Sequence, residues 1–211
     1  MQNIIEISKK HTTDKIAHGY IPFYNKILRD YPDNANVLEI GIWHGESLSL
    51  WADVFPEGII TGINVEPNSI VPKHPRIKGC IGDATNPFFL IQVSDEHGPF
   101  DIIIDDGSHH NHHVIKSFAY LFTILKPGGT YVIEDTLCSY WPDYNELDLH
   151  PETPMGEFKK MADTVNFNGF RQSNMLSNYE AVKKEKDLDI YERTVEGVSF
   201  YPGLIVINKR S

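Results

Sequence analysis

The sequence contains few cysteines and no long hydrophobic run. Its two cysteines, Cys80 and Cys138, stand far apart and form no C-x-x-C pair, so we expect neither a zinc ribbon nor a redox motif of that type. No apolar stretch approaches the roughly 20 residues that cross a bilayer, and the N-terminal segment lacks the apolar core of a signal peptide. We therefore expect a cytoplasmic chain with reduced thiols and no membrane partner.

Positive charge is also scarce. The 211 residues hold 19 Lys and Arg against 29 Asp and Glu, a formal net charge of −10. A nucleic-acid surface needs a basic patch, so we expect no nucleic-acid partner. A small anionic ligand stays compatible with this charge, because the N-terminus of a helix can bind one locally. The partner expected is therefore a small molecule or a saccharide, and the sequence leaves homo-oligomerisation open.

Strand patterns alternate with helix patterns along most of the chain. Such alternation predicts parallel strands joined by right-handed crossovers. The segment "GVSFYPGLIVINK" reads instead as two strands around a Pro-Gly turn, which predicts a hairpin. The sequence thus predicts an α/β fold with a doubly wound, mostly parallel seven-stranded sheet and a C-terminal antiparallel hairpin. Strands are expected at about 37–40, 58–64, 76–82, 99–106 and 130–135, and helices at 20–31, from about 46, and through 114–125.

The length suits a single domain over residues 1–211. Residues 1–35 are expected to form an N-terminal helical cap. Residues 140–190 are polar, with scattered aromatic residues and one helix pattern near 158–165. We interpret 140–190 as a lid or substrate-binding insertion.

A glycine-bearing turn, "EIGIWHGES", follows the first strand. Gly41 and Gly45 allow a tight turn and a close approach to a ligand, Ser47 and the next helix start could hold a carboxylate, and Glu39 could accept from an amine. Trp43 stands where a dinucleotide-binding turn has its second glycine, so a pyrophosphate would be crowded. The methionine end of S-adenosylmethionine fits better, although the turn alone is equally compatible with a structural role.

Polar residues also end the next two strands. Asn64 and Glu66 end the second strand, where a ribose diol is usually held, and Asp83 ends the third, where an adenine amine could be read. Ligands of open α/β sheets bind beyond the carboxyl ends of the strands. Each residue taken alone could be a solvated loop residue, but their regular placement favours a nucleoside site.

Three carboxylates are predicted to meet at the ends of the fourth and fifth strands. Asp106 ends one strand and Glu134 with Asp135 ends the other, and a single helix joins the two. Crowded carboxylates raise one another's pKa, and a hard divalent cation removes that conflict. Oxygen ligands without cysteine favour Mg²⁺ or Mn²⁺. A zinc site within the histidine run 109–113 is disfavoured, because neighbouring residues of a helix point in different directions.

These motifs together resemble the class I S-adenosylmethionine-dependent methyltransferases. The segments "VLEIGIWHGESL", "GDA", "FDIIIDDGSHH", "LKPGGTYVIEDT" and "SFYPGLIVINK" are most similar to the metal-dependent sugar O-methyltransferases of the mycinamicin and elloramycin type. The resemblance covers most of residues 12–140 and the hairpin. It implies a Rossmann-like methyltransferase fold, a metal at Asp106, Glu134 and Asp135, and His109 as the general base.

The resemblance also implies further contacts. The segment "HTTDKIAHGYIPFY" is similar to one that closes over the site in this family, which makes Asp14, His18 and Tyr20 candidates for donor or substrate contact. Trp141 could wall a sugar ring. A helix cap and core packing are equal alternatives for these four residues. The full set of expected cofactor-binding residues is Glu39, Gly41, Gly45, Ser47, Asn64, Glu66, Asp83 and Asp105, where Asp105 has a structural role as an equal alternative.

We therefore predict a Mg²⁺-dependent O-methyltransferase that transfers a methyl group from S-adenosylmethionine to a sugar hydroxyl, in a polysaccharide or a glycosylated natural product. His109 and Asp106 are the expected catalytic residues. The alternatives are an NAD(P)-dependent oxidoreductase, a methyltransferase for a catechol-like or other small acceptor, a metal-dependent hydrolase, and an inactive binding protein. Two features depart from the family: Asn64 replaces an acid, and the chain is shorter than the mycinamicin-type enzymes, so their assembly is not carried over.

Overall fold

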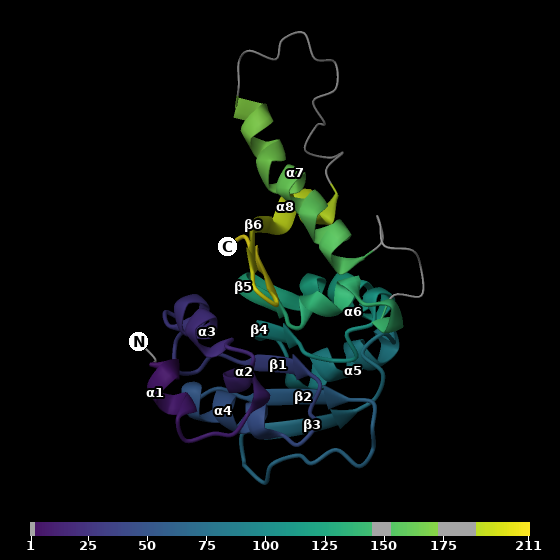
Figure 1. Ribbon diagram of the computed structural model, residues 1–211. Coiled ribbons are helices and arrows are strands. Elements are labelled where there is room, and N and C mark those ends of the chain that lie inside the picture. The colour runs from purple at the N-terminus through teal and green to yellow at the C-terminus, as the bar shows by residue number, and fades with distance from the viewer. Residues whose placement is uncertain (1–2, 145–152, 173–188) are drawn as a thin grey trace.

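Seven strands form one sheet in the order β3-β2-β1-β4-β5-β7-β6 (Figure 1). The computed structural model describes residues 3–144, 153–172 and 189–211, with the backbone alone for 166–172. The first five strands run parallel, and β7 runs antiparallel to both β5 and β6. This arrangement confirms the predicted fold class. The strands are β1 Val37–Ile40, β2 Ile60–Asn64, β3 Ile77–Ile81, β4 Phe100–Asp105, β5 Leu125–Ile133, β6 Val195–Tyr201 and β7 Leu204–Lys209.

Helices cover both faces of the sheet. The helices are α1 Ile4–Ser8, α2 Asp14–Ala17, α3 Ile21–Leu28, α4 Glu46–Val54, α5 Pro87–His97, α6 Asn111–Ile124, α7 Pro154–Gln172 and α8 Ile190–Thr194, with 3₁₀ turns η1 Thr136–Tyr140 and η2 Pro142–Tyr144. Helices α1, α3 and α4 lie on one face, and α5 and α6 lie on the other (Figure 1). Both faces of the central strands are therefore buried.

Alternate side chains of each central strand enter two separate cores. In β4, Ile102 and Ile104 pack in the core under α1, α3 and α4, whereas Ile103 packs in the core under α5 and α6. In β7, Val206 and Ile207 divide in the same way. Side chains alternate in direction along a strand, so a strand buried on both faces needs apolar residues at every position. This requirement explains the unbroken isoleucine run in β4.

The predicted elements agree with the structure except at the start of β5 and in the length of α7. Strands β1 and β2 end where the sequence predicts, and the inward residues Leu48, Trp51 and Phe55 are all buried. The segment "KPGG" was predicted to separate a helix from a strand, but it lies inside β5. The pairing of β4 with β5 shifts register between Phe100 and Ile102, so residues 126–129 form an irregularity that tolerates proline and glycine.

The two predicted subregions are only partly described. Helices α1 to α3 lie within the span of the expected N-terminal cap, and Ile4, Tyr24 and Leu28 are buried in the core of the sheet. Residues 145–152 and 173–188 of the expected lid lie outside the described residues. Within that span, α7 is longer than the predicted helix at 158–165 and rises away from the edge of the sheet (Figure 1). Its side chains Phe158 and Met161 are buried against the second core, and the lid role stays a prediction.

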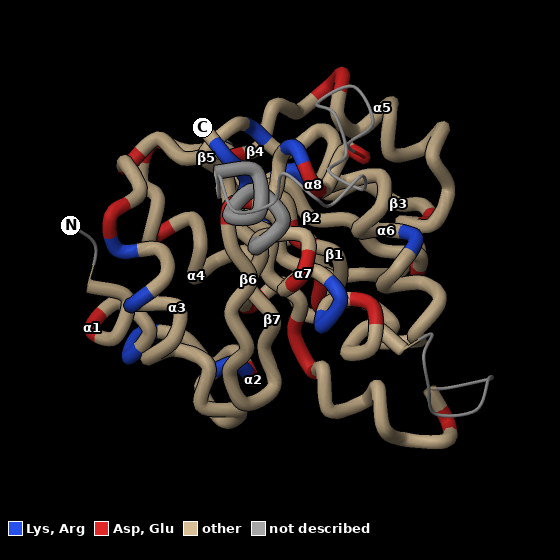
Figure 2. The backbone as a smooth tube through the Cα atoms, turned by 90° about the horizontal axis from the view of Figure 1, so that it is seen from above, with Lys and Arg blue, Asp and Glu red and all other residues tan. Residues whose placement is uncertain are grey.

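The surface agrees with the composition. None of the described helices is long and apolar enough to cross a membrane. Figure 2 shows the molecule from above. In this view the described Lys and Arg positions are scattered among acidic and neutral positions and form no continuous stripe. Among the residues described, the basic positions along the backbone are thus interspersed with acidic ones in this view.

Candidate functional site

A cavity of about 540 Å³ lies at the carboxyl ends of β1 to β4. This is the edge of the sheet where open α/β folds bind their ligands. Its size falls in the range of small-molecule sites, about 300–1,000 Å³. Of the predicted cofactor residues, Gly41, Ser47, Asn64, Glu66, Asp83 and Asp105 line it. Asp14, Asp106, His109 and Asp135 line it as well.

The turn after β1 passes directly against the end of β4. Gly41 has a φ of +98°, and a Cβ at this position would lie 2.0 Å from the carbonyl oxygen of Asp106. Only glycine combines this backbone conformation with so close an approach. Gly41 therefore sets the position of Asp106 relative to the first turn.

Two predicted cofactor residues of the same turn lie outside the cavity lining. Gly45 has a φ of +77°, and a Cβ there would lie 2.5 Å from the carbonyl oxygen of Ile70, so packing accounts for the glycine. Glu39 is fully buried and accepts a hydrogen bond of 2.7 Å from Ser47 Oγ. Within the turn, Gly41 and Ser47 are the predicted residues that reach the cavity.

The side of the cavity under β2 and β3 carries the predicted nucleoside contacts. Asn64 donates a hydrogen bond to the hydroxyl of Ser69, and Glu66 is exposed. Asp83 accepts a hydrogen bond of 2.7 Å from the backbone N–H of Thr85, which lowers the pKa of the Asp83 carboxyl. These three side chains thus present oxygens or an amide along two neighbouring strand ends.

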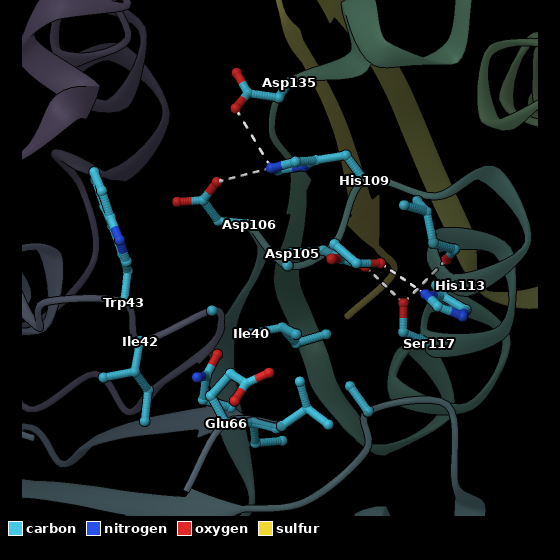
Figure 3. A pocket seen from close by; sticks show the side chains of 18 of the residues that line it. Ile40, Ile42, Trp43, Glu66, Asp105, Asp106, His109, His113, Ser117 and Asp135 are labelled. Atoms are coloured by element: carbon cyan, nitrogen blue, oxygen red, sulfur yellow. Dashed lines mark hydrogen bonds and ion pairs between the residues drawn. The ribbon is translucent and has the colours of Figure 1, made fainter. Parts of the chain in front are cut away.

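Asp105 is held by the protein on several sides. Its carboxylate is buried, and Oδ2 accepts hydrogen bonds from Ser117 Oγ at 2.6 Å and Tyr131 Oη at 3.3 Å. Burial raises the pKa of Asp105 despite these bonds. Asp105 lines the cavity between Asp106 and Ser117 (Figure 3).

Asp106, His109 and Asp135 form what we call the outer cluster. One ligand atom from each side chain lies within 4.8 Å of the others. His109 Nε2 lies 3.6 Å from Asp135 Oδ2 and 3.9 Å from Asp106 Oδ1, as Figure 3 shows. All three side chains are partly exposed to the cavity. The arrangement places two carboxylates and an imidazole around one point that a ligand can reach.

Glu39, Asp106 and Glu134 form a second group, the inner cluster. The ammonium of Lys15 lies among them, 2.6 Å from Asp106 Oδ2, 2.8 Å from Glu134 Oε1 and 3.0 Å from Glu39 Oε1. Asp106 belongs to both clusters. The structure therefore distributes the three predicted metal carboxylates over two adjacent groups, with Asp135 in the outer one and Glu134 in the inner one.

The inner cluster carries more negative than positive charge. Burial acts to lower the pKa of Lys15, but attraction by Asp106, Glu134 and Glu39 outweighs it and keeps the pKa well above its usual value. Burial, followed by repulsion from Asp106, raises the pKa of Glu134 well above its usual value. One ammonium cannot neutralise three carboxylates. The oxygen-rich donor set and this surplus of negative charge fit a further hard cation at Asp106 and Asp135.

Two tyrosines from the N-terminal cap donate to these acids. Tyr20 Oη donates to Asp135 Oδ1 at 2.5 Å, and Tyr24 Oη donates to Glu134. His18, also predicted to contact a ligand, is exposed, and its Nδ1 lies 3.6 Å from Asp135 Oδ1. The sequence predicted ligand contacts for Tyr20 and His18, but neither residue lines the cavity, and those contacts stay a prediction. Lys15 and Tyr24 were not predicted from the sequence. Lys15 was missed because a lysine in the first turn of a short helix is usually exposed to solvent. The only sequence signal was the crowding of acids, which indicated that a positive charge was needed.

Three non-glycine residues have positive φ among the residues described, and all three line the cavity. They are Trp43 at +43°, His109 at +57° and Asp135 at +49°. Such backbone conformations cost about 1–3 kcal/mol each and gather at functional sites. Trp43, whose side chain is 65% exposed, faces the outer cluster from the opposite wall of the cavity (Figure 3).

Trp141 does not line the cavity. It is half exposed between η1 and η2, with its ring 5.9 Å from that of Tyr144. The Tyr144 ring lies 6.4 Å from the His109 ring. Tyr144 therefore lies between Trp141 and His109. The predicted contact of Trp141 with a sugar stays a prediction.

Comparison with known proteins agrees with this architecture. No protein-family model matches the chain. Mycinamicin VI 2''-O-methyltransferase of Micromonospora griseorubida is 39% identical over 176 residues, which are 77% of this chain and 44% of that protein. Demethylmacrocin O-methyltransferase of Streptomyces fradiae is 34% identical over 220 residues, which are 97% of this chain and 52% of that protein. The chain spans about half the length of the curated relatives it matches.

A solved structure shows the same relation in three dimensions. The MycE methyltransferase of the mycinamycin biosynthetic pathway, in complex with Mg, SAH and mycinamycin VI, superposes with a TM-score of 0.80 at 33% identity. The match covers 99% of this chain and 54% of that one. Sequence identity above 30% thus extends over nearly the whole chain, both in the sequence comparison and in the superposition. The chain belongs to the family of S-adenosylmethionine-dependent sugar O-methyltransferases that includes these macrolide-modifying enzymes.

Proposed function

We propose that this chain transfers a methyl group from S-adenosylmethionine to a sugar hydroxyl of a glycosylated natural product, with the assistance of a divalent cation. One observation carries the proposal: a single cavity joins the nucleoside-side residues Asn64, Glu66 and Asp83 to the outer cluster. The names of the relatives support the acceptor class: two are O-methyltransferases named for mycinamicin VI and demethylmacrocin, and a further one, L-olivosyl-oleandolide 3-O-methyltransferase, names a glycosyl group.

The cofactor would lie along the ends of β1 to β3. The methionine portion would lie against Gly41 and Ser47, which line the cavity at the first turn. Glu66 would offer carboxylate oxygens to the ribose hydroxyls, and Asp83 would offer an acceptor to the adenine amine. Asn64 supplies an amide in place of a second acid. The sulfonium would then face the negative outer cluster, which favours the positively charged donor over its neutral product.

Asp106 and Asp135 would hold the cation, with Glu134 behind them. All three offer carboxylate oxygens, and their crowding is unfavourable without positive charge. A bound Mg²⁺ supplies Lewis-acid chemistry that lowers the pKa of an acceptor hydroxyl. Because Asp106 lies at the end of β4 and Asp135 just after β5, the sheet itself fixes the spacing of these side chains.

His109 would accept the proton of the acceptor hydroxyl. The hydroxyl oxygen forms a bond to the methyl carbon while the carbon–sulfur bond breaks, and that electron pair stays on sulfur to give S-adenosylhomocysteine. The imidazolium formed at His109 is stabilised by the Asp106 and Asp135 carboxylates at 3.9 and 3.6 Å. General-base assistance of this kind contributes about 10²–10⁴-fold to the rate.

The proposal is tested by binding and by transfer. Thermal melting with S-adenosylhomocysteine should show stabilisation that NAD does not produce. Protein, S-adenosylmethionine, Mg²⁺ and a macrolide with a free sugar hydroxyl should yield a product heavier by one methyl group, and EDTA should stop the reaction. Stabilisation by NAD alone would favour an oxidoreductase, and faster methylation of a catechol than of any glycoside would assign a different acceptor class.

A further inference from the structure

Lys15 is a fully buried lysine whose ammonium contacts three carboxylates of the site. It lies 2.6 Å from Asp106 Oδ2, 2.8 Å from Glu134 Oε1 and 3.0 Å from Glu39 Oε1. Its helix, α2, belongs to the N-terminal cap, whereas the three acids come from the sheet. The cap therefore places a buried positive charge among these acids, next to the cavity but outside its lining.

The two oxygens of Asp106 are shared between the two clusters. Oδ2 accepts the hydrogen bond from Lys15, and Oδ1 faces His109 Nε2 at 3.9 Å. A carboxylate turns about its terminal bond, so a bond to one oxygen determines where the other points. The hydrogen bond from Lys15 thus presents Oδ1 to the outer cluster.

The number of carboxylates at the site is large enough for both Lys15 and a metal ion to be bound at the same time. Glu39, Asp106, Glu134 and Asp135 carry four negative charges when ionised. Lys15 offsets one of them, a divalent cation would offset two, and the sulfonium would offset the fourth. The buried ammonium and a metal ion are therefore complementary in charge.

We infer that Lys15 is a positioning residue for the divalent cation, because its ammonium fixes Asp106 through Oδ2 and so orients Oδ1 toward Asp135 and His109. This inference rests on the proposed function, namely that the outer cluster binds the cation. The rival reading is that Lys15 competes with the metal for the same acids. The two readings predict opposite changes in metal affinity when Lys15 loses its charge.

The test is a Lys15→Met variant, which keeps much of the side-chain volume and removes the ammonium. Mn²⁺ serves as the probe for the Mg²⁺ site, followed by electron paramagnetic resonance and by calorimetry. Loss of a group that orients a metal ligand lowers metal affinity by about 10- to 100-fold, and we expect that loss here with a broadened Mn²⁺ spectrum. Affinity for S-adenosylhomocysteine without metal should change far less, because Lys15 does not line the cavity.

Lys209→Met is the matched control. The Lys209 ammonium also contacts three oxygens, the carbonyls of Phe122, Thr123 and Leu125 at 2.9, 2.9 and 2.6 Å. It lies at the amino end of β5, across the sheet from the cavity. This variant should lose thermal stability as Lys15→Met does, but it should keep the Mn²⁺ affinity of the wild type.

A double variant, Lys15→Met with Glu39→Gln, separates the orienting effect of Lys15 on Asp106 from its effect on the net charge of the inner cluster. It also provides a second test if Lys15→Met alone does not fold. It removes one positive and one negative charge together, so the inner cluster keeps its net charge. We expect it to be more stable than Lys15→Met and to remain weak in Mn²⁺ binding, because Asp106 is still unheld. Recovery of the wild-type Mn²⁺ affinity in the double variant would show that Lys15 acts through charge alone and would overturn the positioning role.

The remaining outcomes are equally decisive. Unchanged or tighter Mn²⁺ binding by Lys15→Met would overturn the inference and would leave the proposed function intact. Absence of Mn²⁺ binding by the wild type would overturn the metal part of the proposed function and the role of Lys15 with it. A loss of metal affinity that Lys209→Met reproduces would reduce Lys15 to a stabilising residue.

Discussion

Replacing Gly41 by alanine should disturb the site more than an ordinary glycine substitution. At Gly41 a Cβ would lie 2.0 Å from the carbonyl oxygen of Asp106, whereas ordinary van der Waals contact begins at 3.4 Å. The contact is with backbone, which cannot turn away as the end of a flexible side chain can. Either the turn after β1 or the end of β4 must shift by more than 1 Å, and Asp106 would move with it.

The magnitude follows from comparison with Gly128. Gly128 has a φ of +75° and its added Cβ would meet only Ser211 Oγ, at 3.4 Å. Alanine there should lose about 1–2 kcal/mol from the left-handed backbone alone. Gly41→Ala bears the same penalty and the steric overlap in addition, which we expect to bring the loss above about 3 kcal/mol. For a domain of this size 1 kcal/mol lowers Tm by about 2–4 °C, so the expected drop exceeds roughly 6 °C.

Urea unfolding and thermal melting of both variants measure this difference, and Mn²⁺ titration measures its effect on the site. Gly41→Ala should weaken Mn²⁺ binding, because Asp106 leaves its hydrogen bond with Lys15. Gly128→Ala should not. A loss of stability no larger for Gly41→Ala than for Gly128→Ala would refute the claim that close backbone contact sets the position of Asp106.

Three further predictions concern the base, the framework and the pH dependence. His109→Asn should lower the rate of methyl transfer by about 10²–10⁴-fold. Its affinity for S-adenosylhomocysteine, measured by calorimetry, should stay unchanged, because asparagine tolerates the positive φ of +57°. Full turnover by this variant would show that His109 is not the base. Arg76 donates to the carbonyls of Ala52, Phe55 and Gly58 at 2.6, 2.6 and 2.8 Å, so Arg76→Met should lower the free energy of unfolding by about 1.5–3 kcal/mol without changing ligand affinity. An unchanged urea midpoint would contradict that assignment. The pKa of Asp83 is lowered in the folded state, so its stabilisation is present above the unfolded pKa of about 3.9 and is lost as the pH falls through the folded pKa. Asp83→Asn should therefore flatten the decline of Tm in acid, and identical pH curves for variant and wild type would count against this.

The sheet could be predicted because each of its elements carries its own periodic signal. Unbroken apolar runs indicate strands buried on both faces, and the Pro-Gly turn indicates the hairpin. Helices α5 and α8 were not predicted, and α1 and α2 were expected only as unspecified parts of a helical cap over residues 1–35, because no clear apolar stripe distinguishes these helices from loops. The segment "KPGG" misled the prediction of β5, since a bulge between β4 and β5 accommodates residues that usually end a strand.

The site was predictable to the extent that topology determines it. Parallel strands end at one edge, so acids placed after strand ends must gather there, and Asp106, Asp135 and His109 do so. The commitment of Glu39 to Ser47 and Lys15 was not predictable. A carboxylate beside a glycine turn looks the same in sequence whether it faces a ligand or an internal partner.

The sequence by itself determined the succession of the parallel strands and the hairpin, the placement of acids after the strands, and the need for positive charge among them. It did so because these properties depend on local periodicity and on connectivity. Only the tertiary structure shows which positively charged side chain of the chain lies among these acids. Lys15 lies 91 residues from Asp106 in the sequence, and its ammonium is buried among Asp106, Glu134 and Glu39. No local sequence pattern predicts a contact between segments so far apart.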